Sequence, residues 1–549
     1  NNQNLTNAQN TRVSGSISAD AIENGDGGNV IIWSDGDTQF SGSITAQGAT
    51  EGVGGFAEVS GKENLVFSGA ADLSGPNGGG KLLLDPTDIT VAYSGTPTPS
   101  ATLAGAGDAN GNNNLETGES SGVSVTIDPA ALTVILHTGT DVTLQATNDI
   151  IIDGTVAKTD GGDAVLTLVA GNDINVNQTL LGGVGKLGVV LNASGDVLIG
   201  NTIQTNGGVF TSSGVNFTQN SPILTDSTSA NGDVSINHTG TVAINDNIGT
   251  SGSLSGAVSV AGVGGISLGG DVYSNGQDIS FSQPVSLTKT VQVNSGSTSA
   301  GNVSFANTIN GAYGLTAVAG TGDITFSGIV GGTSSLTSFS ASGNDVSLPS
   351  IGDSDTVGVS GVTSLEASNE LILSGDTYKT NAATYSSGIG QKIKLTAGSD
   401  VTFNSNSQNV EFATGDVLLS DGSNLIVNAA AISTEGIRGS STETISLTGS
   451  GAVSLGSIGN AGEIGDVTIS GSSIVSAGVT TSGGNISMNS GSGSGNISLG
   501  GTIDTTGNSV ATAGTVALTS ATLGLTADSY IITDAATTDQ AITLPASVT

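Results

Sequence analysis

Residues 278–326 read DISFSQPVSLTKTVQVNSGSTSAGNVSFANTINGAYGLTAVAGTGDITF, and one short phrase occurs three times in this stretch. The phrase is a β-branched residue, a hydroxyl residue and a phenylalanine, as in Ile279-Ser-Phe281, Val303-Ser-Phe305 and Ile324-Thr-Phe326. Alternation with a period of two is typical of a strand with one buried face. The stretch therefore predicts three short strands whose phenylalanines stack in a core, together with Phe403 from a later strand.

A turn signal precedes the second and third of these strands. Gly301-Asn302 and Gly322-Asp323 stand directly before the β-branched residues. Gly adopts positive φ easily, and we expect each Asn or Asp side chain to hydrogen-bond within its own turn. The same signal opens many other strands, whereas no window of 12 residues has helical spacing. The sequence therefore predicts an all-β protein.

The Asp and Asn of these turns recur at a nearly constant distance. Asp278, Asn302, Asp323 and Asp345 follow one another in steps of 24, 21 and 22 residues. A repeat of this length with two or three strands is typical of a solenoid, in which each repeat forms one coil. Sandwich domains would instead repeat at roughly 100 residues. We therefore predict a parallel β-helix (β-solenoid) with a repeat near 22 residues, or about 25 coils in 549 residues, with outward Ser, Thr and Asn.

One segment interrupts the repeat. Five of the nine prolines lie between Pro76 and Pro129, together with a polar stretch over 105–122. Loops this long without regular structure usually carry function or flexibility. We divide the chain into a first β-helix block (1–92), a polar loop or insertion (93–122) and a continuing β-helix shaft (123–549).

The composition excludes several classes of partner. The chain has 10 Lys plus Arg against 46 Asp plus Glu, a net charge of −36, and no Cys. Nucleic acids and anionic membrane surfaces select clusters of Lys and Arg, so we expect neither as a partner. No apolar run is long enough for a membrane span. The absence of Cys fits a bacterial exported protein.

Residues 54–92 add a resemblance to a known family. The phrases Gly54-Gly-Phe-Ala-Glu-Val-Ser-Gly61 and Leu82-Leu-Leu-Asp-Pro-Thr-Asp-Ile-Thr90 resemble a segment of the filamentous-haemagglutinin-like adhesins of bacterial two-partner secretion. The resemblance implies a right-handed parallel β-helix, export through an outer-membrane secretion partner, and a place outside the cell at the bacterial surface. The family's amino-terminal secretion domain is missing from this sequence, so we expect a shaft fragment of a longer polypeptide.

A candidate calcium loop lies within the polar insertion. Asp108, Asn110, Asn112 and Glu119 occupy positions 1, 3, 5 and 12 of a loop that resembles a helix–loop–helix calcium site. Calcium prefers six to eight oxygen ligands, and a closing bidentate Glu suits position 12. Asn113 stands at position 6, however, where that motif has Gly, and no flanking helices are evident. A solvated Asn-rich loop is the alternative. Calcium is the one cofactor that the sequence suggests.

The sequence offers little for catalysis. His137 and His238 lie about 100 residues apart and have no nucleophile motif beside them. Each follows a strand-like run, so we interpret both as solvated turn residues. Asp353 and Asp355 are the closest carboxylate pair worth inspection, and an acidic turn is the competing interpretation.

These observations favour a non-catalytic, secreted adhesin shaft that binds a cell-surface or matrix ligand such as a glycan. A structural subunit that self-associates into an extracellular filament or sheath is the alternative, because open coil ends present unpaired strand edges. A polysaccharide-cleaving β-helix is a remote third candidate, since such enzymes need clustered carboxylates.

Overall fold

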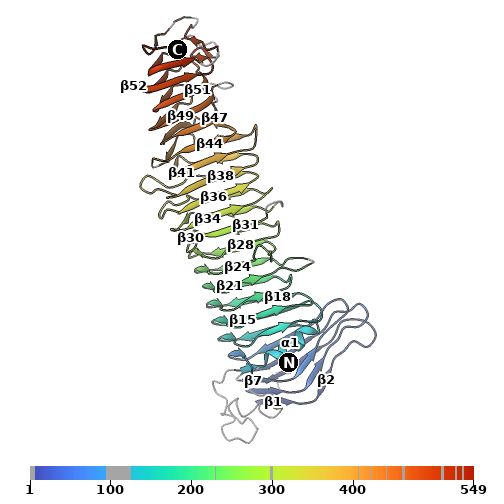
Figure 1. Ribbon diagram of the computed structural model, residues 1–549. Helices are drawn as coiled ribbons and strands as arrows, with labels where there is room; N and C mark the ends of the chain where they lie inside the picture. The colour runs from blue at the N-terminus through green and yellow to red at the C-terminus, as the bar shows by residue number, and fades with distance from the viewer. Residues whose placement is uncertain are drawn as a thin grey trace. The chain divides into compact units, whose positions relative to one another are not determined.

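The computed structural model describes the whole chain except residues 1–5, 63, 94–124, 229, 297–300, 406, 421, 440–441, 460–463, 508–511, 526–527, 535–536 and 539. The fold is nearly all β, with 53% strand and 2% helix, and forms a parallel β-solenoid of about 20 turns (Figure 1). The predicted fold class is confirmed. The spacing is near 24 residues and not 22, because loops lengthen several coils, and the turns are correspondingly fewer than predicted.

The chain divides into two compact units, residues 1–275 and 276–549, and each is described by itself. The predicted insertion falls almost entirely on residues outside the description. The three predicted segments therefore remain predictions.

Two long parallel ladders run through the first unit, one strand of each per coil. The first ladder stacks β3 (Asn29–Ser34), β6 (Phe56–Gly61), β9 (Lys81–Asp85), β12 (Asp141–Ala146), β15 (Ala164–Ala170), β18 (Leu187–Ala193), β21 (Phe210–Gly214), β24 (Val234–His238) and β26 (Val258–Gly262). The second stacks β11 (Val125–Ile127), β10 (Ile89–Val91), β13 (Ile150–Ile152), β16 (Ile174–Val176), β19 (Val197–Ile199), β22 (Phe217–Gln219), β25 (Val242–Ile244) and β27 (Ile266–Leu268).

Shorter sheets complete the coils of this unit. They are β1 (Asn10–Val13), β4 (Asp37–Phe40) and β7 (Asn64–Phe67); β2 (Ser16–Ser18), β5 (Ser43–Thr45) and β8 (Ala70–Asp72); and β14 (Val156–Lys158), β17 (Leu180–Gly182), β20 (Ile203–Gln204) and β23 (Ile223–Leu224). β28 (Val272–Tyr273) follows β27. In every sheet the inward positions are apolar, since the burial alternates along the strands as the sequence pattern predicts.

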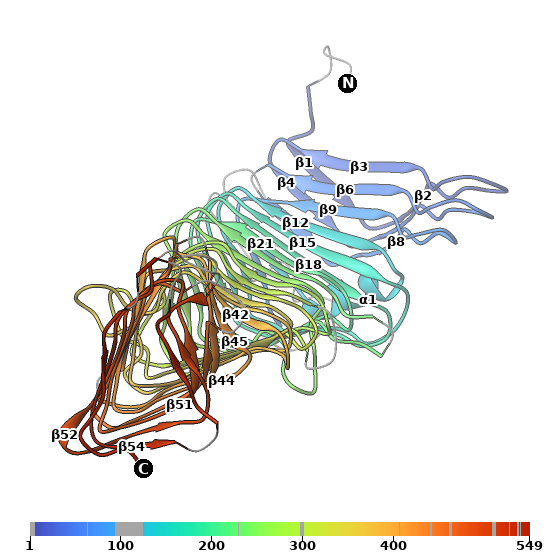
Figure 2. The ribbon, with the colours of Figure 1, turned by 90° about the horizontal axis from the view of Figure 1, so that it is seen from above.

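One helix, α1 (Pro129–His137), lies beside the strands of the first unit (Figure 2). It begins where the Asp128 carboxylate accepts a hydrogen bond from the Ala130 N–H at 2.8 Å and Pro129 supplies a preset φ. Leu132, Ile135 and Leu136 are buried. The sequence search missed this helix because its nine residues are shorter than the 12-residue window.

The second unit has the same construction, again with one strand per coil in each ladder. One ladder stacks β29 (Ile279–Phe281), β32 (Val303–Phe305), β35 (Ile324–Phe326), β37 (Val346–Leu348), β39 (Leu371–Leu373), β42 (Lys392–Leu395) and β45 (Asp416–Leu419). Another stacks β31 (Val291–Asn294), β34 (Gly314–Val318), β36 (Ser338–Gly343), β38 (Val362–Ala367), β41 (Ala382–Ser386), β44 (Val410–Thr414), β47 (Ile432–Arg438), β49 (Ala452–Ile458) and β51 (Ser473–Thr480).

A third ladder of this unit begins further along the chain. It stacks β40 (Thr377–Thr380), β43 (Asp400–Ser405), β46 (Asn424–Ala429), β48 (Ile445–Gly449), β50 (Val467–Ser470), β52 (Ile486–Leu499), β54 (Val516–Leu525) and β56 (Ile542–Thr543). The remaining pairs are β30 (Val285–Leu287) with β33 (Ile309–Asn310), and β53 (Ile503–Asp504) with β55 (Ile531–Ile532).

The predicted phenylalanine stack is present in the core of the second unit. The ring centroids of Phe281 and Phe305 are 4.9 Å apart, those of Phe305 and Phe326 are 5.4 Å apart, and both pairs are nearly parallel. Phe403 is buried as predicted but belongs to a separate cluster, where its ring stacks on Tyr378 at 4.8 Å. The steps of 24, 21 and 22 residues are therefore the true coil lengths in this region, since Ile279, Val303, Ile324 and Val346 pair in register.

Candidate functional surface

The residues of the candidate calcium loop, Asp108, Asn110, Asn112 and Glu119, lie outside the described residues. Calcium binding there remains a prediction. Within the described ranges, no three His, Cys, Asp or Glu side chains gather in a way that could hold a metal ion.

The candidate carboxylate pair forms an acidic turn. The Asp353 carboxylate accepts hydrogen bonds from the backbone N–H of Asp355 at 2.9 Å and of Thr356 at 2.7 Å. These bonds favour the ionised form and hold the pKa of Asp353 below its ordinary value. A general acid needs the opposite shift, so this carboxylate is suited to closing a turn and not to donating a proton.

The interpretation of the two histidines as solvated turn residues is wrong. His137 ends helix α1, where its Nε2 accepts a hydrogen bond from the Thr159 N–H at 3.0 Å. His238 is the last residue of strand β24 and is fully buried. The strand is one residue longer than the sequence suggests, which turns this side chain inward. The polar neighbours Asn237 and Thr239 concealed that position.

Turn Asp and Asn residues form ladders along the first unit. The Asp149 carboxylate accepts from the Asp173 N–H of the next coil at 3.1 Å, and the Asp173 carboxylate accepts from the Asp196 N–H at 2.7 Å. The Asp196 carboxylate accepts from the Asn216 N–H at 3.0 Å. The same pattern recurs in the second unit, where Asp278 accepts from the N–H of Asn302 at 2.8 Å.

These ladders correct the expectation that each side chain bonds within its own turn. Parallel coils stack about 4.8 Å apart, so the N–H of the next turn lies within reach of the carboxylate. Each Asp thereby satisfies a backbone donor that would otherwise be left at the corner. The Asp markers are therefore cross-coil fasteners, and most of their charge serves the architecture.

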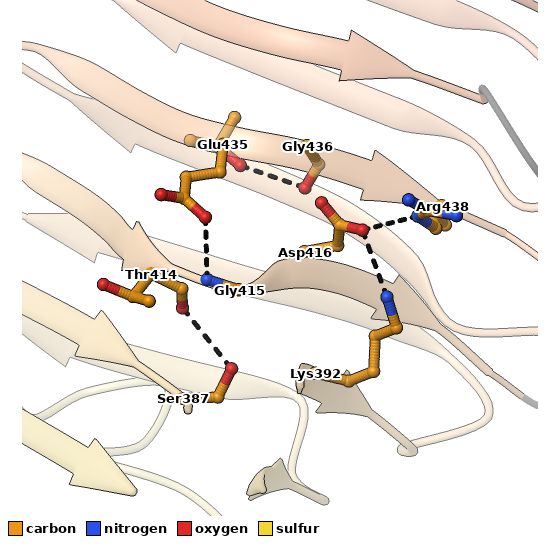
Figure 3. Close-up of polar contacts among 9 residues, drawn as sticks. Ser387, Lys392, Thr414, Gly415, Asp416, Glu435, Gly436 and Arg438 are labelled. Carbon is orange, nitrogen blue, oxygen red and sulfur yellow. Dashed lines mark hydrogen bonds and ion pairs between the residues drawn. The ribbon is translucent and has the colours of Figure 1, made fainter. Parts of the chain in front are cut away.

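A charged cluster lies on the second unit and contains three of the ten basic residues. The Asp416 carboxylate contacts Lys392 Nζ at 3.1 Å and Arg438 Nε at 2.5 Å (Figure 3). Lys394 Nζ contacts the Glu370 carboxylate at 2.5 Å. Although burial opposes it, the bonds from Lys392 and Arg438 hold the pKa of Asp416 below its ordinary value. The cations are thus neutralised by neighbouring coils and do not form an open anion site.

Columns of hydroxyl residues face outward, as predicted. On one face of the second unit Thr316, Ser340, Ser364 and Thr384 pair in register over four coils. In the first unit Thr211, Ser235 and Ser259 do the same. Thr316, Ser340 and Thr384 form no side-chain hydrogen bond with any described residue. These hydroxyls are available to solvent or to a ligand.

Loop length varies at one corner of the first unit, the corner before each strand of the first ladder. Between β20 and β21 this corner spans 205–209, and between β23 and β24 it spans 225–233. Both loops are closed by the same device, because Thr205 Oγ1 donates to the Gly208 carbonyl at 2.5 Å and Thr225 Oγ1 donates to the Gly232 carbonyl at 2.6 Å. A buried hydroxyl therefore seals the core whatever the length of the loop outside it.

Lys158 occupies the same inward position two coils before Thr205. It is fully buried, and its Nζ donates to the Val184 carbonyl at 2.7 Å and to the Asp160 carbonyl at 3.3 Å. Burial lowers the pKa of this ammonium, against the opposing attraction of Asp163 and Asp160. The longer side chain performs the closing role of Thr205 for its own loop. Nothing in its sequence neighbourhood distinguishes it from a surface lysine.

Comparison with protein-family models and with curated proteins found no match to this chain. The described parts of the chain contain no helix with the length and hydrophobicity of a membrane span.

Proposed function

We propose that this chain is a non-catalytic shaft of a secreted bacterial surface protein that mediates attachment to a cell-surface or matrix ligand. The observation that carries the proposal is the set of hydroxyl columns that face outward in register in both units. A ligand with repeated hydrogen-bonding groups, such as a glycan, would find equivalent partners on successive coils about 4.8 Å apart.

The resemblance of residues 54–92 supports the same proposal. Its two phrases, Gly54–Gly61 and Leu82–Thr90, fall on β6 and on β9 with β10, which stack in the first unit. The adhesin family that they resemble is exported through an outer-membrane partner. We propose the same route and an extracellular location for this chain.

Binding of the purified chain to cells tests the proposal. We expect saturable binding that weakens when Thr316, Ser340 and Thr384 are all replaced by Ala, since these side chains point outward and contribute little to folding. Ser280, Ser304 and Thr325, replaced by Ala on a neighbouring face, are the matched control and should leave binding unchanged. Equal binding by both triple variants would assign attachment to another surface.

Self-assembly into a filament is the second candidate. It is favoured by the small, mostly uncharged side chains of the same outward face. Electron microscopy of the purified chain at neutral pH separates the two functions: regular fibres without any ligand support a structural subunit, and dispersed particles that coat cells support the adhesin.

A further inference from the structure

The core of the first unit contains one imidazole. His238 lies inside the coils, with its ring centroid 5.2 Å from that of Phe217, and Gly214 and Gly262 pair with it in register on the two adjacent strands. A Cβ on Gly214 would lie 3.1 Å from His238 Cε1 and 3.2 Å from Nδ1. The ring thus occupies space that the glycine leaves open.

The imidazole has one hydrogen-bonding partner. Its Nε2 lies 3.0 Å from Ser212 Oγ, and its buried Nδ1 has no partner. In the neutral ring a single N–H is present, and Ser212 can donate or accept. The imidazolium has two N–H donors, so protonation would leave the Nδ1–H without an acceptor and a charge in the core.

The surroundings do not compensate a positive charge. Strands β21, β22 and β26, which pack against the ring, contain no ionisable side chain. Burial lowers the pKa of His238 to about 4, against the opposing attraction of Asp196. An unfolded or opened coil returns the ring to its ordinary pKa near 6.5.

We propose that His238 is an acid-sensitive latch whose protonation opens the coils of β21, β24 and β26. Those coils carry the loops over 225–233 and 249–257, the longest of the variable corner, so acid loosens the segment that presents them. The inference does not depend on the proposed attachment function.

The direction of the effect follows from linkage. The opened state binds the proton more tightly than the closed state, so the closed coil is fully stable above about pH 6.5 and loses stability as the pH falls toward 4. From these two pKa values, the open population at pH 5 should exceed that at pH 7.5 roughly 25-fold.

Hydrogen exchange of the full chain, corrected for intrinsic rates, tests the latch. We expect opening of residues 210–262 to rise by about that factor between pH 7.5 and 5, while residues 164–199 serve as the reference. His238→Gln and His238→Phe should both abolish the pH dependence. His137→Gln, the matched control, should keep it.

Two results would overturn the proposal. One is a pH dependence that persists in either folded His238 variant. The other comes from the wild-type chain with ¹³C-labelled histidine, which gives only two imidazole signals to resolve: a His238 signal that titrates near pH 6.5 would show that the ring is protonated without any opening.

Discussion

At the scale of single residues, the same residue type has different roles according to the side of the strand that it occupies. Thr225 points inward and closes a loop through the Gly232 carbonyl, whereas Thr316 points outward and has no partner among the described residues. The sequence predicts the alternation but not the ends of each strand. His238 and Lys158 were misjudged or overlooked for this reason, since one residue of strand length decides whether a polar side chain is buried.

Replacing Asp173 by Ala should locally loosen the turn of the following coil. Its carboxylate is the acceptor for the Asp196 N–H, and loss of such a bond costs about 1 kcal/mol. We expect roughly fivefold faster exchange of the Asp196 amide. Asp153→Ala is the control, because Asp153 binds only the side-chain amide of Asn177. Equal changes in the two variants would contradict the ladder role.

Replacing Thr225 by Val should expose a buried carbonyl without a donor. The Gly232 carbonyl loses the hydroxyl bond at 2.6 Å, and an unsatisfied buried group costs about 1 to 3 kcal/mol. Limited proteolysis should then cut within 225–233 faster than in the wild type. Thr325→Val, at an outward position of β35, should cut at the wild-type rate. Unchanged cleavage in both would show that the loop is held by other contacts.

At the scale of elements, the aromatic stack is the feature that the sequence predicted most fully, because each phenylalanine sits at the same place in its phrase. Helix α1 shows the opposite case. Its cap and proline could have been recognised from Asp128 and Pro129, but its length is below that of a confident periodic signal.

Replacing Phe305 by Ala should destabilise the second unit strongly. Its ring lies between Phe281 and Phe326 and is fully buried, and truncation of a buried phenylalanine costs about 3 to 5 kcal/mol. We expect a lower denaturation temperature and a loss of near-ultraviolet circular dichroism. Ser304→Ala on the outward side of the same strand should change neither. A Phe305→Ala variant that melts like the wild type would refute the stack as a stabilising element.

At the scale of the whole molecule, low charge density and acidity determine solubility. The chain has a net charge of −36 at pH 7 and a pI near 4.1. We expect dispersed particles at pH 7 and association near pH 4, where mutual repulsion vanishes. Light scattering across this range measures the change. Association already at pH 7 would indicate a specific contact and favour the filament alternative.

The sequence by itself determined the all-β class, the parallel coil and the position of the core phenylalanines, because a period of two and a repeat of coil length are local properties of the chain. Only the tertiary structure decided what the polar residues do. The Asp ladders, the closing hydroxyls and the buried His238 depend on which atoms of the next coil lie about 4.8 Å away. That distance joins residues about 24 apart in the chain, and no local pattern records it.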